Sequence, residues 1–158
     1  MGEQNQEYGF ESLASYQHSL KLLKAAYKLA KGLPAFERYN FADQIRRSAL
    51  SVTLNIAEGY GRYHYLDKIR FFYIARGSLT ETLSAFISAH QLGYIDYEQL
   101  EWAREIEAEA EKSLNGYIAF IRKQQQGSKE FGNKYVREEQ LEYCDIPCLA
   151  NELNLEIS

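Results

Sequence analysis

Hydrophobic residues recur at helical spacing along four segments of the chain, which predicts four amphipathic helices. The first starts near residue 13 and is stopped by Gly32-Leu33-Pro34, and the second spans about residues 40–59. The third spans about residues 66–92 and the fourth about 97–123. Long helices joined by short connections pack as antiparallel neighbours. We therefore predict an all-α fold, an antiparallel up-down-up-down four-helix bundle with an irregular C-terminal tail.

The second segment carries apolar residues on two sides. Within a sector of about 80° it places Phe41, Ile45, Ala49, Val52 and Ile56. We expect this stripe to face the core of the bundle. On the other side of the same helix lie Leu50, Leu54 and Ala57. A helix that is apolar on two sides is usually buried between two neighbours, so we expect these three residues to contact another subunit of an oligomer.

The other three segments each have one predicted core face. The first segment contributes Leu13, Tyr16, Leu20, Leu23, Tyr27 and Ala30. The third contributes Phe72, Ala75, Leu79, Leu83, Phe86 and His90. The fourth contributes Leu100, Ala103, Ile106, Ala110, Leu114, Tyr117 and Ile121.

Four residues are expected to mark helix ends or close contacts. Asn40 and Asp96 are suited to cap the second and fourth helices. Gly59 is expected to end the second helix in the left-handed conformation. Gly77 lies inside the third segment, where a glycine costs about 1 kcal/mol of helix propensity. We expect another helix to cross closely at Gly77.

The length of 158 residues predicts one domain. Residues 1–124 would form the bundle, and residues 125–158 an acidic tail that docks on a partner, on a subunit or on the bundle. No run approaches 18 apolar residues, so no membrane span is predicted. Cys144 and Cys148 are the only cysteines and give no disulfide framework. The default location is the cytoplasm.

Charge is distributed unevenly along the chain. The net charge is −4, yet residues 21–76 hold eleven Lys or Arg and four acids. Affinity for phosphate follows the local patch rather than the total charge. The candidate nucleic-acid contacts are Lys21, Lys24, Lys28, Lys31, Arg46, Arg47 and Arg62. The alternative is a solvated helix face whose lysines serve solubility and whose interleaved tyrosines serve packing.

The fourth segment has an acidic stripe at helical spacing, formed by Glu98, Glu101, Glu105 and Glu109. In an antiparallel bundle the first and fourth helices are neighbours, so this stripe and the lysine stripe would face each other across a groove. Alternatively, the two stripes belong to a head-to-tail contact between subunits. Glu58 and Glu81 lie in apolar surroundings, and we interpret them as structural salt-bridge partners of Arg46, Arg47 or Arg76.

Catalytic and metal-binding motifs are not found. The three histidines are spread over the chain without the Glu-x-x-His or His-x-x-x-His pairs of bundle metal sites. There is no phosphate-binding glycine loop, dinucleotide fingerprint or nucleophile elbow. We therefore predict no enzyme, no cofactor and no metal site.

Two runs of the chain resemble a known family. Residues 44–62, QIRRSALSVTLNIAEGYGR, closely resemble the signature of the 23S rRNA intervening-sequence proteins of bacteria. Residues 74–83, IARGSLTETL, resemble that family's second block, and residues 92–95 resemble the turn before its last helix. The family usually has Pro-Ser where this chain has Thr53-Leu54, and losing that proline should straighten the second helix and enlarge its outer apolar stripe.

The resemblance implies a four-helix bundle that assembles as a homopentamer, without a defined activity. A related branch comprises the accessory variability determinants of diversity-generating retroelements, which bind a reverse transcriptase and its template RNA through a basic surface. We hypothesise a non-enzymatic oligomeric scaffold that binds RNA or a nucleoprotein partner. The alternatives are such an accessory determinant, or a protein-interaction module that binds no nucleic acid.

Overall fold

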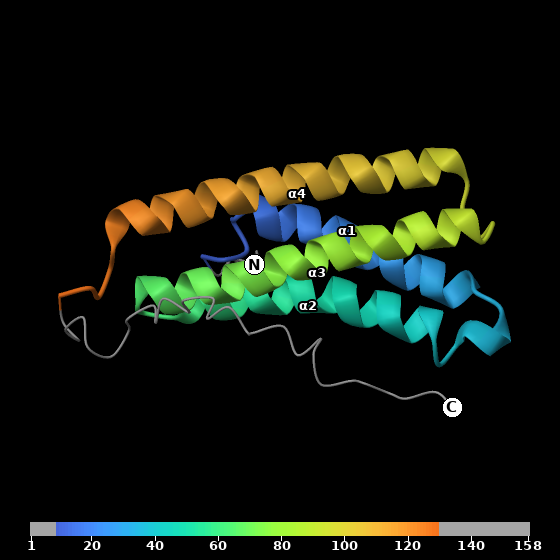
Figure 1. Ribbon diagram of the computed structural model, residues 1–158, viewed down its shortest axis with the longest axis horizontal. Coiled ribbons are helices and arrows are strands. Elements are labelled where there is room, and N and C mark those ends of the chain that lie inside the picture. Colours follow the sequence, from blue (N-terminus) through green and yellow to red (C-terminus); the bar gives the residue numbers. More distant parts are fainter. Residues whose placement is uncertain (1–8, 130–158) are drawn as a thin grey trace, which may run out of the picture. The chain divides into compact units, whose positions relative to one another are not determined.

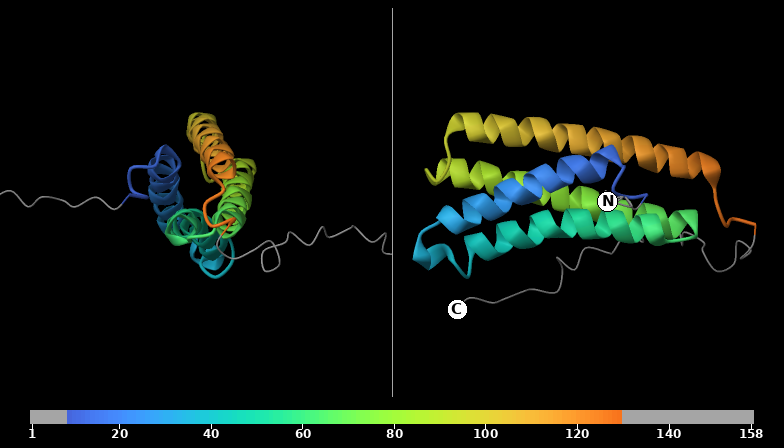
Figure 2. Two further views of the ribbon diagram at one scale, coloured as in Figure 1. Left: turned by 90° about the vertical axis from the view of Figure 1, so that its left-hand side faces the viewer. Right: turned by 180° about the vertical axis from the view of Figure 1, so that it is seen from behind.

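The computed structural model describes residues 9–129 and consists there of four long helices and one short turn (Figure 1). The helices are α1 (Ala14–Gly32), α2 (Phe41–Gly61), α3 (Tyr65–Gln91) and α4 (Tyr97–Gln124), and a 3-10 turn, η1 (Ala35–Glu37), follows α1. Consecutive helices run antiparallel, and α1 also packs against α4. In the end-on view of Figure 2, α1 lies between α2 and α4 around the bundle. The predicted all-α up-down-up-down bundle is confirmed.

Parts of the sequence-based predictions lie outside the described residues. The acidic segment from residue 130 onward, with Cys144 and Cys148, belongs to this group. Its predicted role as a docking tail stays a prediction. In the part of the chain that the structure describes, none of the helices is both long and apolar enough to cross a membrane.

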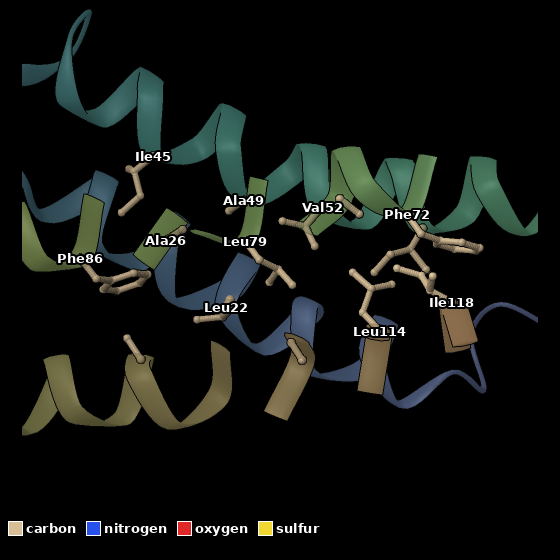
Figure 3. Packing of buried hydrophobic residues seen from close by; sticks show 14 of the residues in the cluster. Leu22, Ala26, Ile45, Ala49, Val52, Phe72, Leu79, Phe86, Leu114 and Ile118 are labelled. Atoms are coloured by element: carbon tan, nitrogen blue, oxygen red, sulfur yellow. The ribbon is translucent and has the colours of Figure 1, made fainter. Parts of the chain in front are cut away.

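The core is formed by one face of each helix (Figure 3). On α2, the predicted core residues Ile45, Ala49, Val52 and Ile56 are all buried. Phe41, at the start of that stripe, is half-buried, and its ring lies 6.1 Å from that of Tyr94. On α3 and α4 most of the predicted core residues are also buried. Helical periodicity therefore identified three of the four core faces.

The predicted core face of α1 is displaced by about one position: Ala30 is buried as predicted, whereas Leu13, Tyr16 and Leu23 pack against the core but are only partly buried. Its buried residues are Ser15, Ser19, Leu22, Ala26 and Ala30, whereas Tyr27 is 45% exposed. Apart from Leu22, these buried residues are small, which allows the backbone of α1 to approach its neighbours closely. The buried Ser19 hydroxyl donates a hydrogen bond to the Ser15 carbonyl at 2.6 Å, which removes the cost of burying it.

Gly59 and Gly77 have roles opposite to those predicted. Gly59 does not end α2, which continues to Gly61. A Cβ on Gly59 would lie 3.0 Å from the Phe71 Cβ and 3.1 Å from the Lys68 carbonyl oxygen, so the close approach of α2 and α3 occurs here. A Cβ on Gly77 would meet nothing within 4 Å. No other helix crosses at Gly77, and the prediction of a close crossing there is wrong.

The two predicted N-caps also differ from each other. Asp96 accepts a hydrogen bond from the Gln99 amide at 2.8 Å, and the Gln99 side chain accepts one from the Asp96 amide at 3.0 Å. This reciprocal capping box confirms the predicted start of α4. Asn40 stands at the N-cap position of α2, but its side chain makes no capping hydrogen bond.

Candidate nucleic-acid interface

The four lysines of the predicted stripe all lie on α1 and are all exposed. They are Lys21, Lys24, Lys28 and Lys31. Within residues 9–129, none of them forms an ion pair with a carboxylate. Their positive charges are therefore not neutralised by the described part of the chain, which is what a phosphate-binding surface requires.

Three of these lysines line a cleft of about 730 Å³ that also includes residues of α4. Its apolar lining is formed by Ala25, Leu29, Leu33, Phe86 and Ile95, together with Tyr94. Its polar and aromatic lining comprises Lys21, Lys24 and Lys28 from α1 and Glu98, Gln99 and Trp102 from α4. Lys31 is not among the lining residues. The volume falls within the range of about 300–1,000 Å³ that is usual for ligand sites.

The cleft contains two polar aromatic side chains, Trp102 and Tyr94, which differ in how far each is held by other residues. Trp102 is 39% exposed, so part of its indole ring faces solvent. Tyr94 donates a hydrogen bond from its hydroxyl to Oε1 of the buried Glu37 at 2.9 Å. Burial, followed by this bond and the charge of Glu37, raises the pKa of Tyr94. The hydrogen bond to Glu37 ties the Tyr94 side chain to the loop after α1. Trp102 is thus the aromatic side chain available for stacking.

The predicted facing of the lysine and glutamate stripes is only partly correct. Glu98 shares the cleft with the lysines, but Glu101 pairs with Arg104 at 2.6 Å on its own helix. Glu109, another member of the stripe, contacts α1 through His18, whose Nδ1 lies 3.2 Å from Oε2 of Glu109. Within residues 9–129, none of the four glutamates of the stripe forms an ion pair with one of the four lysines.

The predicted partners of the α2 arginines are corrected by the structure. Arg46 and Arg47 were expected to pair with Glu58 or Glu81, but both contact Asp43, at 3.6 and 2.7 Å. Arg62 pairs with Glu58 one turn away and lies 4.7 Å over the Phe71 ring. Residues three or four apart on a helix are the nearest charge partners, which explains why local pairs form first. These three arginines are therefore weaker phosphate candidates than the lysines.

Glu58, Glu81 and Arg76 do not form the predicted set of structural salt bridges with one another. Both glutamates are exposed rather than surrounded by apolar groups. Glu81 accepts a hydrogen bond from Gln44 on α2. Arg76 donates to Oδ1 of Asn115 on α4 at 3.0 Å. Of these three residues, Glu58 alone forms an ion pair, with Arg62, within residues 9–129.

The predicted subunit interface lies on the outer face of α2. Leu54 is 58% exposed and Leu50 is 37% exposed, which is unusual for leucines in the middle of a helix. Ala57 is half-buried. The interface itself stays a prediction, because the structure contains one copy of the chain.

Several lining residues of the cleft were missed by reasoning from the sequence. Trp102, Gln99 and Tyr94 were not identified as site residues. The available signal was weak: Trp102 is the only tryptophan and stands among the glutamates of the fourth segment. Its proximity to the α1 lysines depends on how α1 and α4 pack. Among the described residues, no group of three or more His, Cys, Asp or Glu side chains is placed to hold a metal ion.

The fold and the cleft define a four-helix bundle with a cationic groove between its first and last helices. Residues 11–116 match the 23S rRNA-intervening sequence protein family, and the chain belongs to this family. A similar structure comes from Bacteroides thetaiotaomicron and is described as a protein of unknown function from the S23 ribosomal protein family. The two are 27% identical with a TM-score of 0.60, and the match covers 66% of this chain and 97% of the other. No curated protein matches the chain.

Proposed function

We propose that this protein is a non-enzymatic, oligomeric scaffold of the cytoplasm that binds single-stranded RNA, alone or within a nucleoprotein. The observation that carries the proposal is the cleft between α1 and α4, where lysines without a carboxylate partner among residues 9–129 stand beside a partly exposed tryptophan. Lysines neutralise phosphates, while an aromatic ring stacks on a base of any identity. Glu98 and Gln99 supply polar groups for the edge of such a base.

Oligomerisation strengthens this proposal because repeated weak sites act together. The exposed Leu50 and Leu54, with Ala57, form the proposed subunit contact. The number of subunits implied by the resemblance is five. Native mass spectrometry of the full chain measures it directly: a ring of five is expected, and a monomer at micromolar concentration would contradict it.

The main test is a titration of a fluorescent single-stranded RNA of about 20 nucleotides at several salt concentrations. The variant Lys21→Gln, Lys24→Gln, Lys28→Gln should bind at least about tenfold more weakly, and its salt slope should fall by about two to three. The control variant Arg38→Gln, Arg104→Gln, Lys112→Gln removes the same charge outside the cleft. Equal losses in both variants, or salt-independent binding by the unchanged protein, would rule out the cleft as the RNA site.

A finer version of the proposal is an accessory variability determinant, which binds the reverse transcriptase and template RNA of a diversity-generating retroelement. It is supported by the same basic surface and by the resemblance. A protein-interaction module without RNA affinity is the competing class. The RNA titration separates them, because the interaction module should bind no RNA. Deleting residues 125–158 then tests whether the tail is the segment that docks on the protein partner.

A further inference from the structure

Two arginines on the α3–α4 face surround one tyrosine. The Cζ atom of Arg76, on α3, lies 4.9 Å from the centre of the Tyr73 ring. The Cζ atom of Arg122, on α4, lies 5.8 Å from the same ring centre. Arg122 also donates a hydrogen bond to the Tyr73 hydroxyl, and Arg76 donates one to Oδ1 of Asn115 at 3.0 Å. Both guanidinium groups are therefore held in place by contacts between the two helices.

All of these contacts are with neutral groups. In the described part of the chain, neither Arg76 nor Arg122 has a carboxylate within ion-pair distance. Four other arginines, by contrast, pair with acids at short range: Arg46, Arg47, Arg62 and Arg104. Two like charges beside one ring repel each other, so an anion between them would relieve the repulsion.

The cluster is open to solvent and has unused donors. Tyr73 is 38% exposed, Arg122 is exposed and Arg76 is half-buried. Each guanidinium carries five N–H donors, and with partners among residues 9–129 each of these two makes one side-chain hydrogen bond. Because the Tyr73 oxygen accepts from Arg122, its own proton can be donated to a ligand. The three side chains thus offer free donors around one aromatic ring.

We infer that Arg76, Arg122 and Tyr73 form a phosphate-binding site, and that its physiological ligand is a phosphodiester group of the bound RNA. Guanidinium groups match the oxygen geometry of phosphate and bind it through two parallel hydrogen bonds. The site is separate from the α1–α4 cleft, because Trp102 and Arg122 are about 30 Å apart along α4 at 1.5 Å per residue. Twenty residues also turn the helix by about 200° net, so the two sites lie on opposite sides of α4, and an RNA strand that reaches both has to cross over this helix. The RNA part of this inference rests on the proposed function.

The test uses inorganic pyrophosphate first and RNA second. Titration calorimetry of the full chain with pyrophosphate should give saturable binding, weakened at least about tenfold in Arg76→Gln, Arg122→Gln. The matched control, Arg70→Gln with Arg104→Gln, removes two charges from the same helices and should keep most of the affinity. Tyr73→Phe retains the ring and loses the hydroxyl, so it should weaken binding several-fold without depending on the fold of the double variant.

The two proposals fail in different ways. The arginine site is overturned if the full chain does not bind pyrophosphate, or if the double variant and its control bind it with equal affinity. This conclusion holds whether or not the protein binds RNA. Pyrophosphate binding that the double variant loses, in a protein with no affinity for RNA, supports the phosphate site and contradicts the proposed function. If RNA binds, the salt slope of the double variant should fall by about one to two. A glutamate-rich peptide is the competitor in the last experiment. If this peptide displaces the RNA from the site and pyrophosphate does not displace it, the ligand of the site is a protein instead.

Discussion

The α2–α3 contact and the α1–α4 contact use polar residues in opposite ways. Between α2 and α3, Gly59 allows the backbones to come close, and the hydroxyls of Thr82 and Ser48 lie 3.1 Å apart. Between α1 and α4 the surface opens into a cleft in which lysines have no described carboxylate partner. Polar groups that find partners inside a contact stabilise the fold. Polar groups that face a cleft without partners are the better candidates for binding.

The largest effect is expected at Gly59, where the helices approach most closely. In Gly59→Ala the new methyl group would press on the backbone of α3 at Lys68 and on Phe71, neither of which can move without shifting that helix. We expect a net loss of about 1–2 kcal/mol in the free energy of unfolding, after the gain in helix propensity is included. Chemical denaturation measures it.

Gly77→Ala is the matched control on the facing helix. It has open space around the new methyl group, so it should stabilise the protein by about 0.5–1 kcal/mol. The two substitutions should therefore differ in sign. A stabilising Gly59→Ala would show that the α2–α3 contact is looser than described.

A smaller loss is expected from Thr82→Val, which keeps the shape of the side chain and removes the hydroxyl. The Thr82 hydroxyl is fully buried, donates to the Ser78 carbonyl at 2.8 Å and lies beside the Ser48 hydroxyl. Removing it should cost about 1 kcal/mol. Thr80→Val, on the exposed side of α3, is the control and should change stability by less than about 0.5 kcal/mol. If both substitutions change the stability measured by thermal unfolding by the same amount, the buried hydroxyl of Thr82 contributes no more to stability than an exposed one.

The smallest effect concerns Glu107, a buried carboxylate on α4. Burial, followed by the nearby charge of Glu111, raises the pKa of Glu107. The folded state therefore favours the protonated form, so its contribution to stability is present below the unfolded pKa and is lost as pH rises through the folded pKa. Glu107→Gln should raise the Tm by about 2 °C at pH 7 and make no difference near pH 3.

Glu105→Gln serves as the control for Glu107, because it removes one acid from the exposed side of the same helix. It should leave the Tm nearly unchanged across the same pH range. If Glu107→Gln lowers the Tm at pH 7, the charged carboxylate stabilises the fold, which contradicts this prediction.

Much of the fold follows from local pattern, as particular elements demonstrate. The third helix was predicted over about residues 66–92 and spans Tyr65–Gln91. The capping box at Asp96 involves residues three positions apart, so it too is readable from the sequence. The core face of α1 was misjudged because large apolar residues and small buried ones follow the same helical period. Only packing decides which of the two stripes is inside.

The candidate site was predictable only in part, for a related reason. The lysine stripe is a local pattern, and so its spacing along α1 could be read directly. Whether a charge has a partner depends on residues elsewhere: Arg47 is neutralised by Asp43, whereas Arg76 contacts Asn115 on another helix. Trp102 joins the site only because α4 packs beside α1.

The sequence by itself determined the helices, their antiparallel order, most core faces and the family, because these depend on helical period and on short motifs. The tertiary structure decided which glycine lies at a close contact, which cations remain unpaired and where a cleft forms. Those features depend on the distance between helices, which is set by the side chains of both partners together. No single segment contains that information.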